Sequence, residues 1–282
     1  MTDASHRPHF PGIMGLINVG AAVMGALCLA ALLAASGFAV DAYPTSTVRI
    51  LAQHYSAEED SPFNRQELVD AAVATAQFTV KDNDTQRLFD TLATINISAA
   101  SAGRGQFGQA PDLRGLTPDE SGHFDIGQLQ EAFACASQTY VLDEAAISHL
   151  NDCYQVISKA GWLLLGCLVL GVACLAHVFF RCSRRAFGLS LAIPAGGVLA
   201  GFGAALAWLA LDFNGLFAAF HGLFFQEGTW TFPWDSLLIC MYPLDFWVAM
   251  GCIWFAVSII CSLISLVVGI TCIRRSPTPA TL

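Results

Sequence analysis

Residues 159–212 decide the fold class, and their sequence is KAGWLLLGCLVLGVACLAHVFFRCSRRAFGLSLAIPAGGVLAGFGAALAWLALD. No charged side chain occurs between Lys159 and Arg181, nor between Arg185 and Asp212. Each run is at least as long as the ~20 apolar residues that a helix needs to cross the hydrocarbon core of a membrane. A helix is expected because an open strand would leave backbone groups unpaired in lipid. The stretch therefore predicts two transmembrane helices joined by a short arginine-rich turn.

Two further uncharged runs lie outside this stretch, one between Arg7 and Asp41 and one between Asp245 and Arg274. Only 12% of the chain is charged, against roughly 25% in soluble domains. The first run is an alternative candidate for a cleaved signal peptide, with small residues near Ala34. Its apolar part is longer than the roughly 7–15 residues of a signal core, which favours a membrane anchor. We therefore predict an all-α polytopic membrane protein with four transmembrane helices.

The distribution of charge predicts the orientation of these helices. Basic residues cluster at the predicted turn, before the start of the first span and after the end of the last span: Arg7, Arg181, Arg184, Arg185, Arg274 and Arg275. The loop from residue 41 to 158 carries six Lys or Arg and seventeen Asp or Glu, within a net charge of −9. Because basic residues favour the cytoplasmic side, we predict a plasma-membrane protein with both termini in the cytoplasm. Without a basic groove, nucleic acid is not an expected partner.

The predicted segments follow from these runs. They are a cytoplasmic tail 1–11, a transmembrane helix 12–40, an extracytoplasmic loop 41–158, a transmembrane helix 159–180, a cytoplasmic turn 181–186, a transmembrane helix 187–211, an extracytoplasmic aromatic segment 212–244, a transmembrane helix 245–273 and a cytoplasmic tail 274–282. Within the third span, Gly196 and Gly197 favour close contact between helices.

The large first loop is expected to be mostly helical. Asp143 is suited to cap a helix that runs into the second span, whereas residues 98–122, rich in Gly, Ser and Ala, indicate an exposed flexible insertion. Cys135 and Cys153 also lie in this loop, where a disulfide between them is an open alternative.

The aromatic segment contains the residue most suggestive of chemistry, His221. We expect a short helix over residues 214–226 at the membrane boundary, where aromatic rings accumulate. An ionisable group in such apolar surroundings needs a partner or a purpose, and burial favours the neutral imidazole that acts as a base. A histidine that caps a backbone carbonyl is the alternative. Asn214 shares its helix face and Asp212 lies just outside the helix, so both are supporting candidates, although Asp212 equally fits a simple boundary residue.

The second candidate is His149, near the outer end of the second span. The i, i+3, i+4 spacing places His149, Asp152 and Cys153 on one helix face, so that Asp152 is a candidate to orient the imidazole. A solvated polar helix face is the alternative. Two histidines and an aspartate also suit a metal, but the tight spacing of metal-binding motifs is missing, so no metal or cofactor is predicted.

Two sequence blocks resemble the bacterial lipoprotein intramolecular transacylase family (Lit) and its uncharacterised membrane relatives. They are Glu144-x-x-x-x-His149-Leu150-x-Asp152 before the second span, and Phe220-His221-x-x-Phe224-Phe225 followed by Thr229-Trp230 and Pro243 before the fourth. Four spans with a large first outer loop are also similar to the family. In this chain Cys153 and Tyr242 stand where the pattern has aliphatic residues, and Tyr242 is kept as a supporting candidate.

This resemblance implies an acyltransferase that moves an O-linked acyl chain of a diacylglyceryl lipoprotein to the amine of its N-terminal cysteine, which yields a lyso-form lipoprotein. The two family histidines considered catalytic correspond to His149 and His221. His221 is the expected general base and His149 the expected oxyanion stabiliser or proton shuttle, with the roles open to exchange. The expected partners are diacylglyceryl lipoproteins and membrane lipids. A non-catalytic membrane sensor or scaffold, or a metal-binding membrane protein, remains the alternative.

Overall fold

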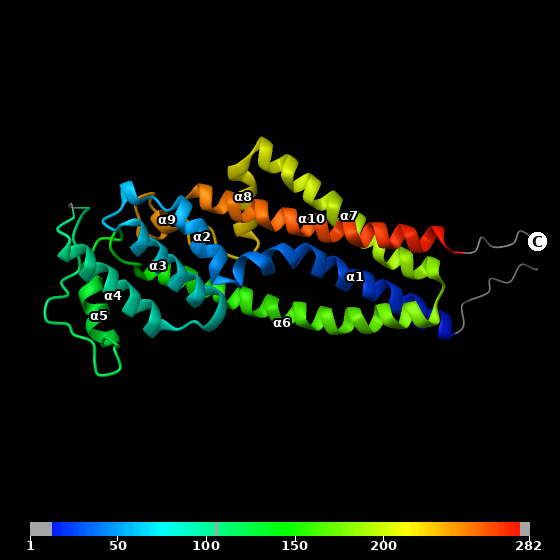
Figure 1. Cartoon of the computed structure of the whole chain (residues 1–282), viewed down its shortest axis with the longest axis horizontal. Helices are drawn as coiled ribbons and strands as arrows, with labels where there is room; N and C mark the ends of the chain where they lie inside the picture. Colours follow the sequence, from blue (N-terminus) through cyan, green and yellow to red (C-terminus); the bar gives the residue numbers. More distant parts are fainter. Residues whose placement is uncertain (1–12, 105–106, 277–282) are drawn as a thin grey trace, which may run out of the picture. The chain divides into compact units, whose positions relative to one another are not determined.

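The computed structural model describes residues 13–104 and 107–276, and the regular structure in these ranges is entirely helical (Figure 1). Four helices are long and apolar enough to cross a membrane: α1 (Ile13–Ala42), α6 (Glu144–Arg181), α7 (Arg184–Leu211) and α10 (Leu244–Arg274). The shortest, α7, has 28 residues, which at ~1.5 Å per residue exceeds the ~30 Å hydrocarbon core. The predicted all-α membrane fold with four spans is confirmed.

Helix α6 joins the outer loop to the second span without a break. It begins after Asp143, whose Oδ1 accepts a hydrogen bond from the backbone N–H of Ala146 at 2.8 Å, and continues for 38 residues. The capping carboxylate satisfies an N–H group that has no partner within the helix. The loop helix expected from Asp143 and the second span are therefore one element.

The chain divides into two compact units. The first comprises Met1–Ser36, Trp162–Ala204 and Ser258–Leu282, and the second comprises Gly37–Gly161 and Ala205–Val257. Each of the four long helices contributes residues to both units. Among the described residues, the first unit therefore consists mainly of helix segments predicted to lie in lipid, and the second holds the outer loop together with one end of each long helix.

Glycine allows close helix approach in the first unit. A Cβ atom on Gly188 of α7 would lie 2.6 Å from the carbonyl oxygen of Gly269 in α10. A Cβ on Gly171 of α6 would lie 2.9 Å from the Cβ of Cys28 in α1. By contrast, a Cβ on Gly196 or Gly197 would meet nothing within 4 Å. Small residues therefore mediate helix packing as expected in membranes, but at other positions than the predicted ones.

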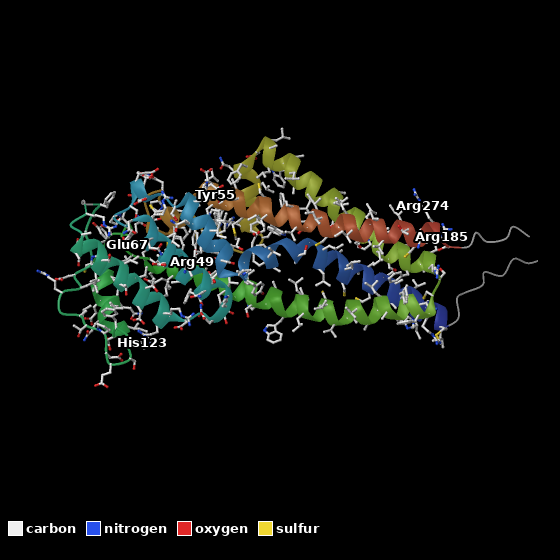
Figure 2. The ribbon with its side chains drawn as sticks, in the orientation of Figure 1. Arg49, Tyr55, Glu67, His123, Arg185 and Arg274 are labelled. Carbon is white, nitrogen blue, oxygen red and sulfur yellow. The ribbon has the colours of Figure 1, made fainter. Side chains whose placement is uncertain are left out.

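Two arginines of the first unit lie at the same end of it. Arg185, just after the turn between α6 and α7, and Arg274, the last residue of α10, are drawn at the same end of this unit (Figure 2). This grouping agrees with the predicted placement of the arginines on a single side. The side of the membrane and the kind of membrane stay predictions.

The second unit is built around α3 (Arg65–Gln77). This helix packs against α2 (Thr45–Tyr55), α4 (Thr85–Ser101) and α9 (Leu237–Met241), and α5 (Ile126–Ala134) packs on α4. Two short helical turns, η1 (Glu58–Asp60) and η2 (Phe78–Asp82), flank α3. Apolar side chains with relative exposure under 2% form the core of this unit: Phe63, Leu68, Val69, Leu88, Leu92, Leu129, Leu237, Met241 and Phe246.

Ion pairs anchor the segment expected to be a flexible insertion. Helix α4 extends into it as far as Ser101. Just beyond, the Arg104 guanidinium donates two hydrogen bonds to the Glu67 carboxylate, at 2.6 and 2.7 Å. Further along, His123 Nδ1 lies 2.7 Å from Asp90 Oδ2 on α4. The irregular chain is thus attached to the helical core at two points, whose charged hydrogen bonds are stronger than neutral ones.

The aromatic segment between α7 and α10 separates into two parts with different surroundings. The first is α8 (Phe213–Gly222), which has no buried residue and is shorter than the expected helix over 214–226. The second is α9, begun by the Ser236 hydroxyl, which accepts from Ile239 N–H, and four of its five residues are buried. The sequence predicts an extracytoplasmic aromatic segment over residues 212–244, with a boundary helix only over 214–226. The structure instead places α9 in the core of the second unit.

The crossing of α1 and α10 in the second unit provides a test of packing. A Cβ on Gly37 would lie 2.0 Å from the carbonyl oxygen of Trp254, which is backbone and has little freedom to move. Gly37→Ala should lower stability by ~1–3 kcal/mol, since overpacking forces the helices apart, measured as a lower unfolding temperature in detergent. Gly20→Ala is the matched control in the same helix, because nothing lies within 4 Å of the added Cβ. Equal unfolding temperatures for the two variants would contradict this close contact.

Candidate active site

The first candidate, His149, lies in the second turn of α6 and is half-buried among aromatic rings. Its ring centroid lies 4.9 Å from that of Phe225 and 5.6 Å from that of Phe232. Its Nε2 lies 3.5 Å from the Sγ of Cys153, one helical turn further along. Its Nδ1 is buried and has no hydrogen-bond partner among the residues that the structure describes. The apolar rings next to His149 favour the neutral form of its imidazole.

The second candidate, His221, is held by the helix that carries it. The Asp212 carboxylate accepts a hydrogen bond from Gly215 N–H at 2.8 Å and so starts α8. One turn before the histidine, the carbonyl of Phe217 accepts a hydrogen bond from His221 Nδ1 at 2.9 Å. Because a carbonyl can only accept, Nδ1 carries the proton and Nε2 has a free lone pair. Burial lowers the pKa of His221, and the hydrogen bond to Phe217 opposes this only in part.

Aromatic side chains connect the two histidines. Phe225 contacts both, with its ring centroid 4.9 Å from that of His149 and 6.0 Å from that of His221. On another side, His221 stacks on Trp230 at 4.8 Å with an interplanar angle of 29°. We call the set formed by His149, Phe217, His221, Phe225, Trp230 and Phe232 the ring cluster. All its members belong to the second unit, so the fold brings together two imidazoles that are distant in sequence.

The other predicted site residues take positions around this cluster or away from it. Asp152 and Asn214 are exposed, and Asp212 caps α8. Tyr242 is buried in the core, where its hydroxyl donates to the carbonyl of Ala72. Tyr242 therefore connects α3 to the end of α9, and among the described residues it forms no hydrogen bond or ring contact with either histidine.

The two loop cysteines are not joined. Cys135 is exposed at the end of α5, and Cys153 faces His149, both as free thiols. The alternative of a disulfide is thus absent from the structure, because Cys153 points into the ring cluster. Among residues 13–104 and 107–276, no group of three His, Cys, Asp or Glu side chains is arranged to hold a metal ion.

Two residues that the structure singles out were not predicted from the sequence, and a third, Cys153, was predicted only to share the helix face of His149. Trp230 stacks on His221, and its indole Nε1 is buried without a partner among the described residues. Phe225 contacts both imidazoles, and Cys153 contacts one. Trp230 and Phe225 stand in the second of the two family blocks, and this position could have indicated that they belong to the site. For Cys153 the signal was its departure from the pattern beside His149.

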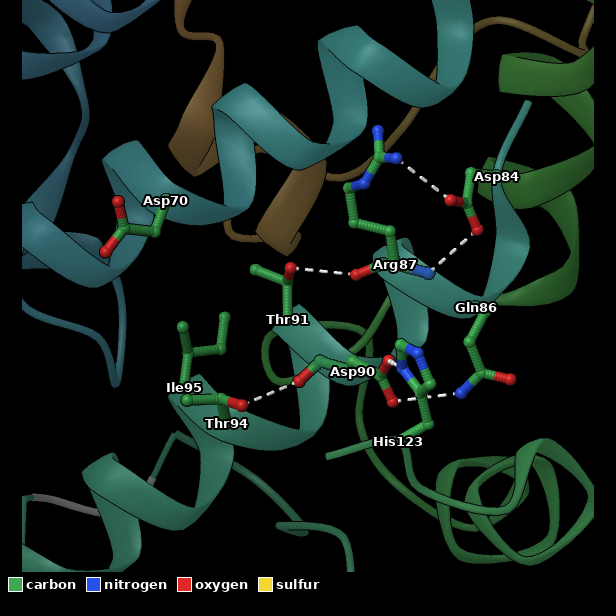
Figure 3. Close-up of a pocket in the computed structure, with 9 residues that line it drawn as sticks. All are labelled: Asp70, Asp84, Gln86, Arg87, Asp90, Thr91, Thr94, Ile95 and His123. Carbon is green, nitrogen blue, oxygen red and sulfur yellow. Dashed lines mark hydrogen bonds and ion pairs between the residues drawn. The ribbon is translucent and has the colours of Figure 1, made fainter. Parts of the chain in front are cut away.

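A polar hollow of about 550 Å³ elsewhere in the second unit offers a competing location (Figure 3). It is lined by Asp70, Asp84, Gln86, Arg87, Asp90, Thr91, Thr94, Ile95 and His123. Its charged groups already pair with one another: Arg87 with Asp84 at 3.0 Å, and His123 with Asp90 at 2.7 Å. Groups satisfied in this way are less suited to proton transfer than the ring cluster, where a lone pair and two N–H groups are free of partners in the described chain.

The fold and the ring cluster together define a polytopic membrane protein with a pair of half-buried histidines. A family model described as lipoprotein intramolecular transacylase Lit matches residues 126–247, a range that contains both histidines. The resemblance to the Lit family is thereby confirmed over this range. Among curated proteins, none matches this chain.

Solved structures of a Bacillus cereus protein have a similar fold. One is the in meso structure of its membrane integral lipoprotein intramolecular transacylase Lit, with a TM-score of 0.53 at 13% identity, covering 92% of this chain and 95% of that one. A variant of that protein with one histidine replaced by alanine gives a TM-score of 0.54 at 12% identity, covering 93% and 96%. These likenesses support the four-span helical fold over nearly the whole chain.

The ion pair at the polar hollow makes a pH-dependent prediction. The Asp90 carboxylate raises the pKa of His123 above its ordinary value. The ion pair that attaches the chain at His123 is therefore fully formed below the pKa that His123 has in the unfolded chain. It is lost as pH rises through the raised pKa of His123 in the folded protein. Deuterium uptake by residues 119–125, corrected for intrinsic exchange, should increase over that pH interval.

A His123→Gln variant should show no such step, and Asp112→Asn, which alters an exposed ion pair in the same irregular chain, should retain it. The same step in the His123→Gln variant would exclude this ion pair as its cause.

Proposed function

We propose that this protein is a membrane acyltransferase that moves an O-linked acyl chain of a diacylglyceryl lipoprotein to the amine of the N-terminal cysteine. The observation that carries the proposal is the ring cluster, in which Phe225 contacts both His149 and His221. The match of residues 126–247 to the transacylase family supports it. The partners are then diacylglyceryl lipoproteins and membrane lipids, and the reaction takes place at the outer surface of the plasma membrane, with both termini cytoplasmic.

His221 suits the role of general base. Its Nε2 lone pair is free because Nδ1–H is engaged by Phe217, and its lowered pKa keeps the ring neutral near pH 7. A neutral imidazole removes a proton from the substrate ammonium or from the attacking amine, which makes the nitrogen nucleophilic. Such general-base assistance contributes ~10²–10⁴-fold to the rate.

The reaction exchanges one bond for another within a single substrate molecule. The amine nitrogen bonds to the ester carbonyl carbon, and the tetrahedral intermediate then loses the glyceryl oxygen, which takes the proton held by His221. The products are an amide and a free glyceryl hydroxyl, so atoms balance without a co-reactant. Converting an ester to an amide is downhill, and the linkage of amine and ester in one molecule adds the advantage of proximity.

The surface of the aromatic segment suits the acyl chains of such a substrate. On and just after α8, Phe220, Leu223 and Phe224 have relative exposures of 41%, 76% and 48%. Trp234, further along the segment, has 70%. Large apolar and aromatic side chains of this kind settle at the membrane–water interface. Acyl chains held there would present their ester groups at the level of His221.

Replacement of the proposed base tests the function directly. His221→Ala should abolish the lyso-form product, and His149→Ala should reduce it by at least ~10²-fold, since each removes a group acting on the transition state. The measurement is mass spectrometry of lipoprotein N-termini from cells that accumulate diacyl lipoproteins. His54→Ala, at an exposed position on α2, is the control and should retain activity. A folded wild-type protein that yields no lyso-form product would favour the sensor or scaffold alternative.

The pH dependence of turnover provides an independent test. Because burial lowers the pKa of His221, the ring stays neutral below the ordinary histidine value of about 6.5. The substrate α-amine, with an ordinary pKa of about 7.7–8.0, adds an acidic limb that does not depend on the enzyme. Once kcat/KM is divided by the fraction of free amine, activity should persist below the ordinary histidine value and fall only as pH drops through the lowered pKa. A fall of this corrected profile centred at or above the ordinary value would contradict the assignment of His221 as base.

A further inference from the structure

Two N–H groups in the ring cluster are buried without an acceptor. Of the buried polar side-chain atoms that lack a hydrogen-bond partner in the described chain, His149 Nδ1 and Trp230 Nε1 both belong to this cluster. Leaving such a group unsatisfied is costly, because its hydration is lost without a replacement hydrogen bond. A site that binds an acceptor recovers this cost only when its ligand is present, so unpaired donors next to a base point to a ligand oxygen.

The contact with Cys153 determines that His149 Nδ1 is a donor. The Sγ of Cys153 lies 3.5 Å from Nε2, and a thiol in apolar surroundings keeps its proton. Thiol sulfur is a weak acceptor, whereas the imidazole lone pair is a good one. The S–H group therefore donates to Nε2, and the ring proton lies on Nδ1. An aliphatic residue at position 153 would leave the choice of tautomer to other contacts.

His221 has the complementary arrangement. Its Nδ1–H donates to the carbonyl of Phe217, so its Nε2 is an acceptor. Trp230, stacked on the same ring at 4.8 Å, has only a donor to offer. The cluster thus presents one nitrogen that takes a proton and two that give hydrogen bonds. This is the division that attack of an amine on an ester requires.

We propose that His149 Nδ1–H and Trp230 Nε1–H together bind the carbonyl oxygen of the acyl ester, and that Cys153 is a positioning residue that holds His149 in the donating tautomer. The inference rests on the proposed acyl transfer. As the amine nitrogen attacks, the carbonyl electron pair moves to oxygen, where both N–H groups stabilise the negative charge. When the pair returns, the bond to the glyceryl oxygen breaks and His221 delivers the proton to it. The Cys153 thiol keeps its proton throughout and forms no acyl bond.

The indole N–H can be removed while the aromatic ring is retained. Trp230→Phe should lower kcat by ~10²-fold, the effect of losing one oxyanion donor, with KM changed less than about twofold because the ester oxygen accepts more strongly in the transition state. Trp162→Phe is the matched control, since this exposed tryptophan of α6 lies outside both the ring cluster and the aromatic segment, and should keep the wild-type kcat. An unchanged kcat in a folded Trp230→Phe protein would overturn the role of Trp230.

The tautomer can be measured without turnover. Nitrogen-15 spectra of protein labelled in its histidine rings distinguish a protonated from an unprotonated Nδ1, and the His149 signal is the one lost in His149→Gln. We expect a protonated Nδ1 in the wild type and in Cys153→Ser, whose hydroxyl still donates, but a mixture of tautomers in Cys153→Ala. The kcat should fall in Cys153→Ala and recover in Cys153→Ser. Rescue by a hydroxyl would not follow from a packing role alone.

The outcomes separate this inference from the proposed function. A wild-type His149 protonated on Nε2 would overturn the role of Cys153 even if lyso-form lipoprotein is made. A hydroxylamine-labile acyl group on Cys153 during turnover would also overturn it, since the thiol would then be a nucleophile. If the wild type makes no lyso-form product, the acyl transfer fails and the carbonyl-binding role fails with it, whichever tautomer the spectra report.

Discussion

The contact of Phe225 with both imidazoles is the constraint on which the candidate site depends. His149 belongs to a helix that is capped by an aspartate in the second unit, whereas His221 belongs to a ten-residue helix with no buried residue. Within the described chain, ring contacts connect these two histidines in one cluster. Since offset and edge-to-face aromatic pairs have preferred geometries, the rings fix not only the proximity of the histidines but also the direction in which their nitrogens point.

Hydrogen bonds then give the two histidines opposite properties. Both imidazoles lie in apolar surroundings, and by residue type alone they are interchangeable. The carbonyl of Phe217 engages Nδ1 of His221, and the thiol of Cys153 engages Nε2 of His149. The proposed roles of base and donor, which the sequence leaves open to exchange, therefore depend on two contacts within the chain. Both contacts are made by neighbours that carry no charge.

The fold was largely predictable because lipid imposes a simple rule on sequence. Uncharged runs of sufficient length gave the four spans, and a capping aspartate indicated the start of α6. The buried helix α9 was missed because its five residues, flanked by aromatic side chains, have the same composition as the boundary segment around them. Glycine contacts were expected at Gly196, yet the close approach is at Gly188, since composition does not show which helix face meets a neighbour. The stacking of Trp230 on His221 was not predicted, because it depends on distance, which a sequence does not contain, whereas the i, i+4 spacing already placed Cys153 on the helix face of His149.

The absence of buried residues in α8, within the described chain, has a consequence for the medium in which the protein works. The apolar residue Phe220 of this helix is 41% exposed, so at the predicted membrane boundary lipid would take part of the place that a hydrophobic core takes in a soluble protein. Under the proposed function, acyl packing and headgroup hydration would then influence the position of His221 together with the polypeptide. Bilayer thickness and fluidity would thereby affect the geometry of the proposed reaction, and a micelle that replaces the bilayer would alter it.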